Sequence, residues 1–255
     1  MTMSDRSGSD LSGRRAVVTG AASGIGAAVA TRLAGLGVHV VVCDIDAGGA
    51  ARTAERIGGE ALAIDLSRTD ELAGVEFDAD ILVNNAGIQH VAPVERFEPD
   101  RFAFMLRLML EAPFLLTRAV LPGMYERGWG RIIHLSSVHG LRASAYKSAY
   151  VSAKHGLLGL SKVIALEGAA KGVTSNCVCP GYVRTPLVEN QLADQAAAHG
   201  LSTDEVLSEV LLAKSAVKRL IEPGEVAGAV AYLCSPEASA VTGTELILDG
   251  GWSAA

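Results

Sequence analysis

The chain has 255 residues, of which 49% are hydrophobic and 20% are charged, and its formal net charge is −6. A chain of this length can bury one large core, and the high apolar fraction suits a sheet that is covered on both faces. The acidic balance offers no basic surface for phosphates, which argues against nucleic acid as a partner.

The N-terminal segment and the cysteines indicate the cellular compartment in which we expect the protein. Residues 1–12, MTMSDRSGSDLS, are polar and lack the apolar run of a signal peptide, so we expect a disordered leader there. No apolar run approaches the length of a membrane span. The cysteines lack metal-ligand spacing and are typical of buried, reduced thiols in a cytoplasmic protein without a metal. They are Cys43, Cys177, Cys179 and Cys234.

Short apolar runs alternate with longer segments of helical period. The runs that predict strands are 16–19, 38–43, 61–64, 81–83, 131–135, 174–178 and 245–248. The segments that predict the main helices are 27–35, about 100–127 and about 150–170. Such alternation indicates right-handed βαβ crossovers. The predicted fold class is therefore α/β, a single doubly wound Rossmann domain over residues 13–255 with a seven-stranded parallel sheet.

Two segments depart from the regular alternation. Residues 65–84 are short, so the helix between the third and fourth strands should be clipped. Residues 186–222 carry no strand pattern, and Ser202 to Glu205 match a helix capping box. Because ligands in such folds bind at the carboxyl ends of the strands, we expect a helical substrate lid at about 186–222.

A glycine-rich turn follows the first predicted strand. Thr19 to Gly26 read TGAASGIG, and glycines at such a turn let backbone N–H groups approach a pyrophosphate at a helix N-terminus. A turn of this kind can also serve packing alone. The strand before it, the helix after it and an acid downstream favour a dinucleotide site. The candidate cofactor residues in the turn are Gly20, Ser23, Gly24, Ile25 and Gly26.

The downstream acid is Asp44, at the end of the second predicted strand. A carboxylate there can accept hydrogen bonds from the adenosine ribose and would repel a 2′-phosphate. Ala21 and Ala22 supply no positive charge to offset that repulsion, so the sequence favours NAD as cofactor. The alternative is that Asp44 only caps a helix.

Four ordered motifs give the chain a resemblance to the short-chain dehydrogenase/reductase family. TGAASGIG is similar to the family's TGxxxGxG element, and the NNAG, YxxxK and PG elements follow at 84–87, 150–154 and 180–181. The resemblance covers the chain from about residue 13. It implies that Asp65 and Leu66 contact the adenine and that Asn85, Ala86 and Gly87 pass beneath the ribose. It also implies cofactor contacts from Tyr150, Lys154, Pro180, Gly181, Val183 and Thr185.

Three residues form a candidate catalytic set. Oxidation of an alcohol needs a base for the hydroxyl proton, and Tyr150 and Lys154 lie four apart on one helix face. The Lys154 ammonium and a positively charged nicotinamide would both favour a Tyr150 phenolate and so lower its pKa. Ser137, at the end of the fifth predicted strand, could stabilise the reacting oxygen. A Tyr and a Lys four apart are otherwise most often a solvated helix surface.

Further segments resemble the 3-hydroxybutyrate dehydrogenase branch of this family. They include SVHGL at 137–141, YKSAY at 146–150 and TPLVENQ at 185–191. The resemblance implies a small anionic hydroxy acid as substrate, with its carboxylate bound by four residues. These are Gln89, His139, Lys147 and Gln191, with Ser137 and Tyr150 at the reacting carbon. Taken singly, each of the four could be a structural or surface residue. Tyr146 is interpreted as packing.

Met109 departs from the family pattern, which places an Asn there. Pro113, four residues on, lacks an N–H group, so it should kink the helix and free the Met109 carbonyl. By the resemblance, a backbone carbonyl at this position holds a relay water beside the catalytic lysine. We expect the Met109 carbonyl to do this and its side chain to pack.

Two alternative functions stay open, and the resemblance also implies an assembly. One is a short-chain dehydrogenase for another small hydroxy acid or a 3-oxoacyl substrate, and the other is a non-catalytic NAD-binding sensor. In the family, the helices corresponding to residues 102–121 and 150–170 pair between subunits. Both are rich in apolar residues here, so we expect a homotetramer.

Overall fold

The protein's structure, a computed structural model, describes residues 11–72, 74–75, 77–186, 188–189 and 202–254. A seven-stranded sheet in the order β3-β2-β1-β4-β5-β6-β7 forms its centre, and every pairing is parallel. This confirms the predicted α/β class and sheet. The strands are β1 Arg15–Thr19, β2 His39–Asp44, β3 Glu60–Ala63, β4 Ile81–Asn84, β5 Gly130–Leu135, β6 Val173–Pro180 and β7 Glu245–Leu248.

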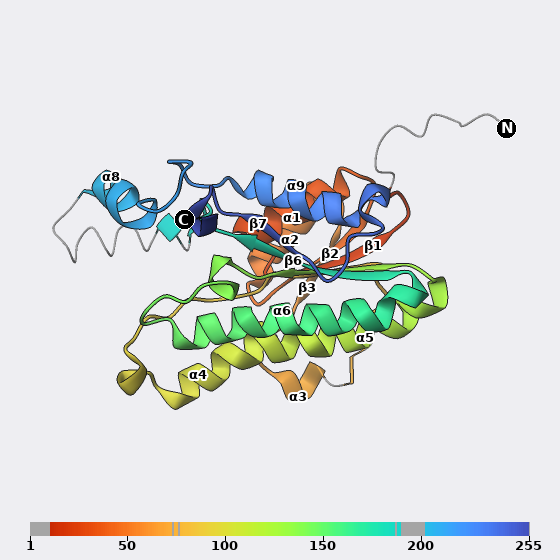
Figure 1. The fold of residues 1–255 in the computed structure, drawn as a ribbon. Coiled ribbons are helices and arrows are strands. Elements are labelled where there is room, and N and C mark those ends of the chain that lie inside the picture. The colour runs from red at the N-terminus through yellow and green to blue at the C-terminus, as the bar shows by residue number, and fades with distance from the viewer. Residues whose placement is uncertain (1–10, 73, 76, 187, 190–201, 255) are drawn as a thin grey trace.

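Helices cover both faces of the sheet (Figure 1). On one face lie α1 Gly24–Ala34, α2 Ala47–Ile57 and α9 Pro223–Cys234. On the other lie α3 Thr69–Leu72, α4 Pro99–Leu106, α5 Ala112–Arg127 and α6 Ser148–Gly168. The short α8 Thr203–Glu205 lies at one end of the sheet. This two-sided cover buries β4, β5 and β6 along their whole lengths.

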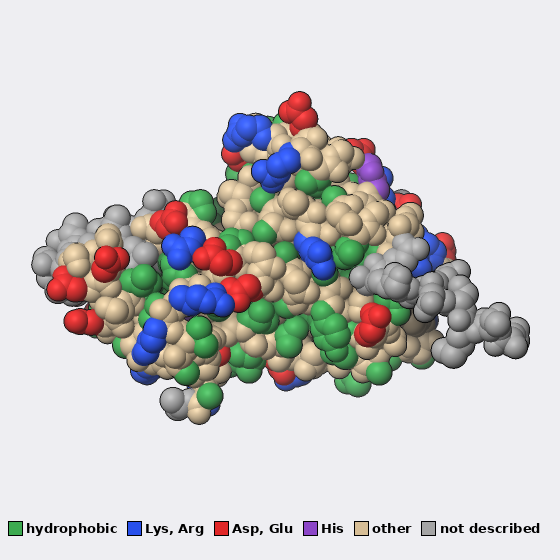
Figure 2. All heavy atoms as spheres, turned by 90° about the horizontal axis from the view of Figure 1, so that it is seen from above, with side chains coloured by type: hydrophobic (Ala, Val, Ile, Leu, Met, Phe, Trp, Pro, Cys, Tyr) green, Lys and Arg blue, Asp and Glu red, His purple; other side chains and the backbone are tan. Residues whose placement is uncertain are grey.

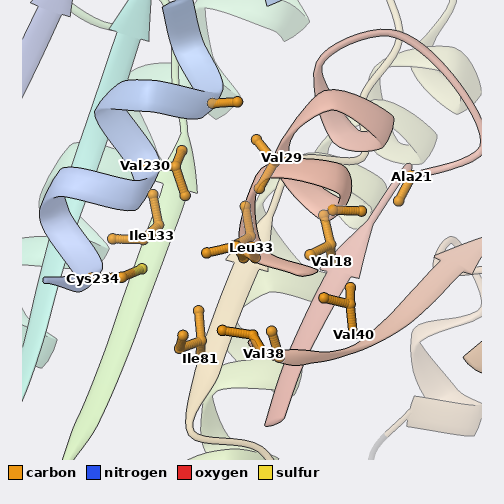
Figure 3. Close-up of a cluster of buried hydrophobic side chains, with 14 of the residues drawn as sticks. Val18, Ala21, Val29, Leu33, Val38, Val40, Ile81, Ile133, Val230 and Cys234 are labelled. Atoms are coloured by element: carbon orange, nitrogen blue, oxygen red, sulfur yellow. The ribbon is translucent and has the colours of Figure 1, made fainter. Parts of the chain in front are cut away.

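The first half of the core lies between the sheet and the helices α1 and α9. Val29 and Leu33 of α1 meet Val230 of α9 above Val18 and Ile133 of the strands (Figure 3). All five are completely or almost completely buried, and burial of each such side chain contributes about 1.5–3 kcal/mol. The outer surface over these helices carries basic and acidic side chains next to one another (Figure 2).

The second half of the core lies under α5 and α6. Leu116 and Val120 of α5 and Ile164 of α6 pack on Leu82 and Ile132 of the sheet. α6 packs on β6 and on the segment that follows β5. Its first turns therefore lie beside the carboxyl ends of these two strands. The fold therefore brings residues 136–155 to the edge where the cofactor motifs end.

The predicted elements are present, with shifted boundaries. Most strands extend one or two residues beyond the apolar runs, and α3 is only one turn long, as expected for a clipped helix. The long predicted helix is divided into α4 and α5 by a π-helical segment, Arg107–Glu111. The leader prediction was wrong at Leu11, which is 3% exposed and belongs to the core. Residues 1–10 lie outside the described residues.

The expected lid segment is only partly described. The capping box at Ser202 and Glu205 is confirmed, and a π-helical turn over Val206–Leu211 follows it. Val206 and Leu211 pack against Tyr182, in the loop after β6, which places this segment beside the carboxyl ends of the strands. A role as a lid stays a prediction. Within the described part of the chain, no helix has the length and apolarity needed to cross a membrane.

Candidate active site

The glycine-rich turn between β1 and α1 is packed closely against the segment after β4. Gly20 has a φ of +64°, and a Cβ there would lie 2.8 Å from the Ala86 Cα. The Asn85 side-chain amide donates to the carbonyls of Thr19 at 2.8 Å and Gly20 at 3.0 Å. In turn, Thr19 Oγ1 accepts the N–H groups of Asn85 and Ala86. The close approach requires glycine at position 20, and Thr19 is a site residue that the motif reading missed.

The N-terminus of α1 is open toward a ligand. Ser23 is its N-cap, but the Ser23 side chain makes no capping hydrogen bond, so the first N–H groups of α1 are left for another acceptor. A Cβ on Gly24 would lie 3.3 Å from the Thr185 Cγ2, so the loop after β6 faces this end of the helix. A pyrophosphate group fits such a site, because N–H groups and the helix dipole both favour an anion.

Asp44 ends β2 with its carboxylate turned toward the glycine-rich turn. One oxygen accepts the Ala22 N–H at 2.9 Å and the other accepts the Asp46 N–H at 3.0 Å. Each oxygen keeps a second lone pair, so the carboxylate can still accept ribose hydroxyls. The N-cap of α2 is Asp46, which accepts the Gly49 N–H. The alternative role of Asp44 as a helix cap is therefore wrong.

A cavity of about 560 Å³ runs along the carboxyl ends of the strands. Gly26 does not line it, since its Cα packs against the Gly20 carbonyl. The apolar wall formed by Ile88, Phe104 and Leu108 was not predicted. The sequence-predicted residues that line the cavity are Gly20, Ser23, Gly24, Ile25, Asp44, Asp65, Leu66, Asn85, Ala86, Gly87, Ser137, Tyr150, Lys154, Pro180, Gly181, Val183 and Thr185.

Ser137, Tyr150 and Lys154 meet at this cavity. Lys154 is 4% exposed, and its ammonium donates to the Leu135 carbonyl at 2.6 Å and lies 5.5 Å from the Tyr150 ring centre. The Lys154 carbonyl accepts the Ser136 hydroxyl at 2.9 Å, which fixes α6 against the end of β5. Burial lowers the pKa of Lys154 to about 8, so most of it stays protonated at neutral pH.

The pKa of Tyr150 differs from the expectation. Burial raises it above its ordinary value, and the hydrogen bond with Ser137 only partly offsets this effect. The expected lowering is therefore not a property of the protein alone. Desolvation disfavours the phenolate until additional positive charge lies close to the ring.

A second polar group lies beside Tyr150. The Lys147 ammonium is 3.1 Å from His139 Nε2, and the His139 ring meets the Tyr150 ring edge-on at 6.1 Å. Burial and then the Lys147 charge lower the pKa of His139 to about 4, so the imidazole is neutral. Among the described residues, two buried atoms of the predicted substrate-binding side chains, Gln89 Oε1 and His139 Nδ1, have no hydrogen-bond partner. The cation and the unpartnered polar atoms suit a small polar ligand.

One predicted substrate residue lies outside the described part of the chain, and one residue beside His139 was not predicted. Gln191 lies outside the described residues. Trp252, near the end of the chain, meets His139 edge-on at 6.0 Å and was not singled out from the sequence. No local pattern marks it, because only the fold brings the last residues to this edge of the sheet.

Comparison with known proteins agrees with this geometry. The family profile described as enoyl-(acyl carrier protein) reductase matches residues 20–253. Two D-beta-hydroxybutyrate dehydrogenases are similar, one from Rhizobium meliloti (41% identity, 94% of this chain, 99% of that one) and one from Cupriavidus necator (42%, 96% and 99%). A 3-oxoacyl-(acyl-carrier-protein) reductase from Vibrio cholerae is 36% identical over 95% of this chain and 98% of its own. The chain belongs to the short-chain dehydrogenase/reductase family.

A solved structure of the same family supports the assignment. It is described as an NAD(P)-dependent gluconate 5-dehydrogenase from Beutenbergia cavernae with bound NADP. The TM-score is 0.85 at 34% identity, and the match covers 96% of this chain and 99% of that one. This chain is therefore an oxidoreductase of the short-chain dehydrogenase/reductase family, whose fold binds a nicotinamide cofactor.

Met109, at the position where the family pattern has Asn, lies inside the π-helical segment. Its side chain is completely buried and packs near Gly87, where a Cβ would lie 3.3 Å from the Met109 Sδ. The Ala112 N–H donates to the carbonyl of Arg107, five residues back. Pro113 has no N–H to give to the next carbonyls. The helix is thus irregular where the sequence predicted a kink.

The interpretation of Tyr146 as packing was wrong. Its side chain is 57% exposed, and its backbone has a φ of +67°. A left-handed backbone turn at a tyrosine is not visible in a sequence, because side chains of this size rarely adopt it.

Proposed function

We propose that this chain is an NAD-dependent dehydrogenase that oxidises D-3-hydroxybutyrate to acetoacetate. The observation that carries the proposal is the Lys147 ammonium against His139, whose ring lies beside Tyr150. A half-buried cation this close to Tyr150 favours a substrate with an anionic group near its reacting carbon. The two similar D-beta-hydroxybutyrate dehydrogenases support the same substrate.

One group of residues would bind the substrate carboxylate, and another would act at the reacting carbon. Lys147, His139 and Gln89 would hold the carboxylate, and Gln191 is proposed to join them. Ser137 would donate a hydrogen bond to the reacting oxygen, while the Tyr150 hydroxyl group, as its phenolate, takes the proton from the substrate alcohol. The Lys154 ammonium stabilises that phenolate. The bound nicotinamide cofactor supplies the hydride acceptor.

The cofactor proposed is NAD rather than NADP. Two carboxylates, Asp44 and Asp46, follow β2 at the point where the adenosine ribose would lie, and the Asp46 side chain already caps α2. A 2′-phosphate there would meet like charge, while Ala21 and Ala22 offer no cation. We expect a preference for NAD⁺ over NADP⁺ of at least about tenfold, from lost hydrogen bonds plus repulsion.

A spectrophotometric assay of the purified protein tests both proposals. NADH and NADPH formation is followed with D- and L-3-hydroxybutyrate, other short hydroxy acids and a 3-hydroxyacyl thioester. We expect the highest kcat/KM with D-3-hydroxybutyrate and NAD⁺. Equal kcat/KM for the two cofactors would contradict the cofactor proposal, and higher kcat/KM for the thioester would contradict the substrate proposal.

A 3-oxoacyl reductase is the second candidate function. The 36% identity to the Vibrio cholerae 3-oxoacyl reductase supports it. The Lys147 ammonium beside the buried His139 argues against it, because an acyl thioester has no charge near the reacting carbon. The thioester arm of the same assay decides between the two.

A further inference from the structure

The segment that leads into α6 contains a residue in an unusual backbone conformation. Tyr146 is the single non-glycine residue with positive φ in the described part of the chain. Gly adopts this region freely, Asn and Asp adopt it less often, and bulky residues seldom do. Because the Tyr146 ring is 57% exposed, its burial does not offset the unfavourable backbone. A conformation kept against its own preference indicates that neighbouring contacts require it.

Three contacts depend on the direction that the chain takes at Tyr146. Its carbonyl accepts the Ala92 N–H at 2.9 Å. The next residue, Lys147, starts α6, and its carbonyl accepts the Val151 N–H at 2.9 Å. The Lys147 ammonium lies 3.1 Å from His139 Nε2. If φ at Tyr146 changed to the usual negative region, the chain before Tyr146 would rotate relative to the chain after it. The three contacts could then not all persist.

The contacts connect two parts of the anion subsite. Ala92 belongs to the loop that carries Gln89, whose Oε1 is buried without a hydrogen-bond partner in the part of the chain that the structure describes, as is His139 Nδ1 on the other side. We propose that Tyr146 is a positioning residue of this subsite, acting through its left-handed backbone and not through its ring. It turns Lys147 toward His139 and fastens the Gln89 loop beside them. This inference rests on the proposed function, which assigns the substrate carboxylate to these residues.

Four variants separate the backbone from the ring. Tyr146→Gly and Tyr146→Asn remove the ring but tolerate positive φ, whereas Tyr146→Ala and Tyr146→Val remove it and disfavour that region, Val the most. We expect the KM for 3-hydroxybutyrate to stay within about twofold for Gly and Asn, and to rise about threefold for Ala and at least about tenfold for Val. The kcat and the KM for NAD⁺ should change by less than about twofold in all four.

The order of the variants decides the question. Gly is smaller than Ala, so an effect of lost side-chain size would make Gly the worse of the two, whereas the backbone effect makes Ala the worse. A KM raised equally in all four variants would assign the role to the ring, and an unchanged KM in all four would show that Tyr146 positions nothing. Either result overturns the proposal. Thermal melting shows which variants are folded, and Ala carries the comparison if Val is not.

A second readout does not depend on the substrate. The Lys147 ammonium lowers the pKa of His139, so displacing it should raise that pKa, measured by NMR on the substrate-free protein. We expect a rise in the Val and Ala variants and no change in the Asn variant. No change in any variant contradicts the proposal. If the unaltered protein oxidises no hydroxy acid, the proposed function fails, while this comparison still reports on the placement of Lys147.

Discussion

The pKa of Tyr150 depends on the groups around it. Burial alone raises the pKa of Tyr150, and Lys154 is itself buried with a pKa lowered to about 8. A desolvated tyrosine and a desolvated lysine are costly to keep unless they act together. Their shared position at the cavity supports the proposed role of the pair in proton transfer.

The first prediction concerns this pair. Tyr150→Phe should lower kcat by at least about a thousandfold, since the base is lost, while the Kd for NAD changes little. Lys154→Ala should lower kcat and weaken NAD binding together, because the ammonium also lies at the cofactor cavity. Steady-state kinetics and calorimetric titration with NAD measure the two effects. A Tyr150→Phe protein with near-normal kcat would remove Tyr150 from the mechanism.

Residues in the four motifs could be predicted because a parallel sheet places the carboxyl ends of its strands together. Asn85 and Gly181, which belong to two of the motifs, follow β4 and β6, and both line one cavity with Asp44 at the end of β2 and Ser137 after β5. Trp252 could not be predicted, since its contact with His139 depends on the path of the whole chain. Nor could the backbone angle of Tyr146.

At the level of elements, the division of the long helix explains how Met109 can replace the family's Asn. The π-helical segment Arg107–Glu111 shifts the hydrogen-bond register, and Pro113 can complete neither register. The helix backbone is therefore irregular in this segment whichever side chain is present at position 109. The apolar pattern predicted one continuous helix. It could not show the π segment, because one extra residue in a helical turn is not visible in the apolar periodicity of the sequence. Pro113 indicated only where the irregularity lies.

The second prediction follows from that division. Met109→Asn should change kcat by less than about tenfold, or ~1.4 kcal/mol, because the freed carbonyl and not the side chain is proposed to hold the relay water. Pro113→Ala should lower kcat by restoring an N–H that competes for that carbonyl. The kcat of each variant is measured across pH. A large gain on installing Asn would mean that the relay is broken in the natural sequence.

For the whole molecule, two buried neutral histidines make stability depend on pH. Burial lowers the pKa of His134 to about 3, and burial with Lys147 lowers that of His139 to about 4. An unfolded histidine titrates near 6.5. Above that pH neither state is charged and stability is complete. Between 6.5 and the folded values only the unfolded chain takes up protons, so stability falls as the pH falls.

The third prediction puts a size on this effect. Between pH 7 and pH 5 the free energy of unfolding should fall by about 2 kcal/mol for each of the two histidines. His134→Asn should remove about half of the fall, since Asn84 keeps a polar neighbour at the paired position. Urea unfolding at the two pH values measures it. An identical fall in the variant would contradict the assignment to His134.

The fourth prediction concerns assembly. Phe114 of α5 and Val163 and Leu166 of α6 are 49%, 52% and 85% exposed. Leu106, Leu110 and Phe114 also line a groove between these helices. Apolar helix faces of this kind fit a subunit interface, so we propose a homotetramer. Light scattering at micromolar concentration should give four times 26.4 kDa, and Phe114→Glu should lower the mass. A monomer in the unaltered protein would contradict the proposal.

We propose that the protein recognises the carboxylate of a short hydroxy acid through Lys147. Methyl 3-hydroxybutyrate keeps the reacting carbon and removes the charge, so the ratio of kcat/KM for acid and ester isolates that recognition. Loss of a charged partner for a buried carboxylate costs about 2–5 kcal/mol. The measurement is this ratio in the unaltered protein and in Lys147→Ala. We expect a strong preference for the acid, lost in the variant through a higher KM for the acid alone. Equal kcat/KM for acid and ester in the unaltered protein, or an equal loss for both substrates in the variant, would contradict it.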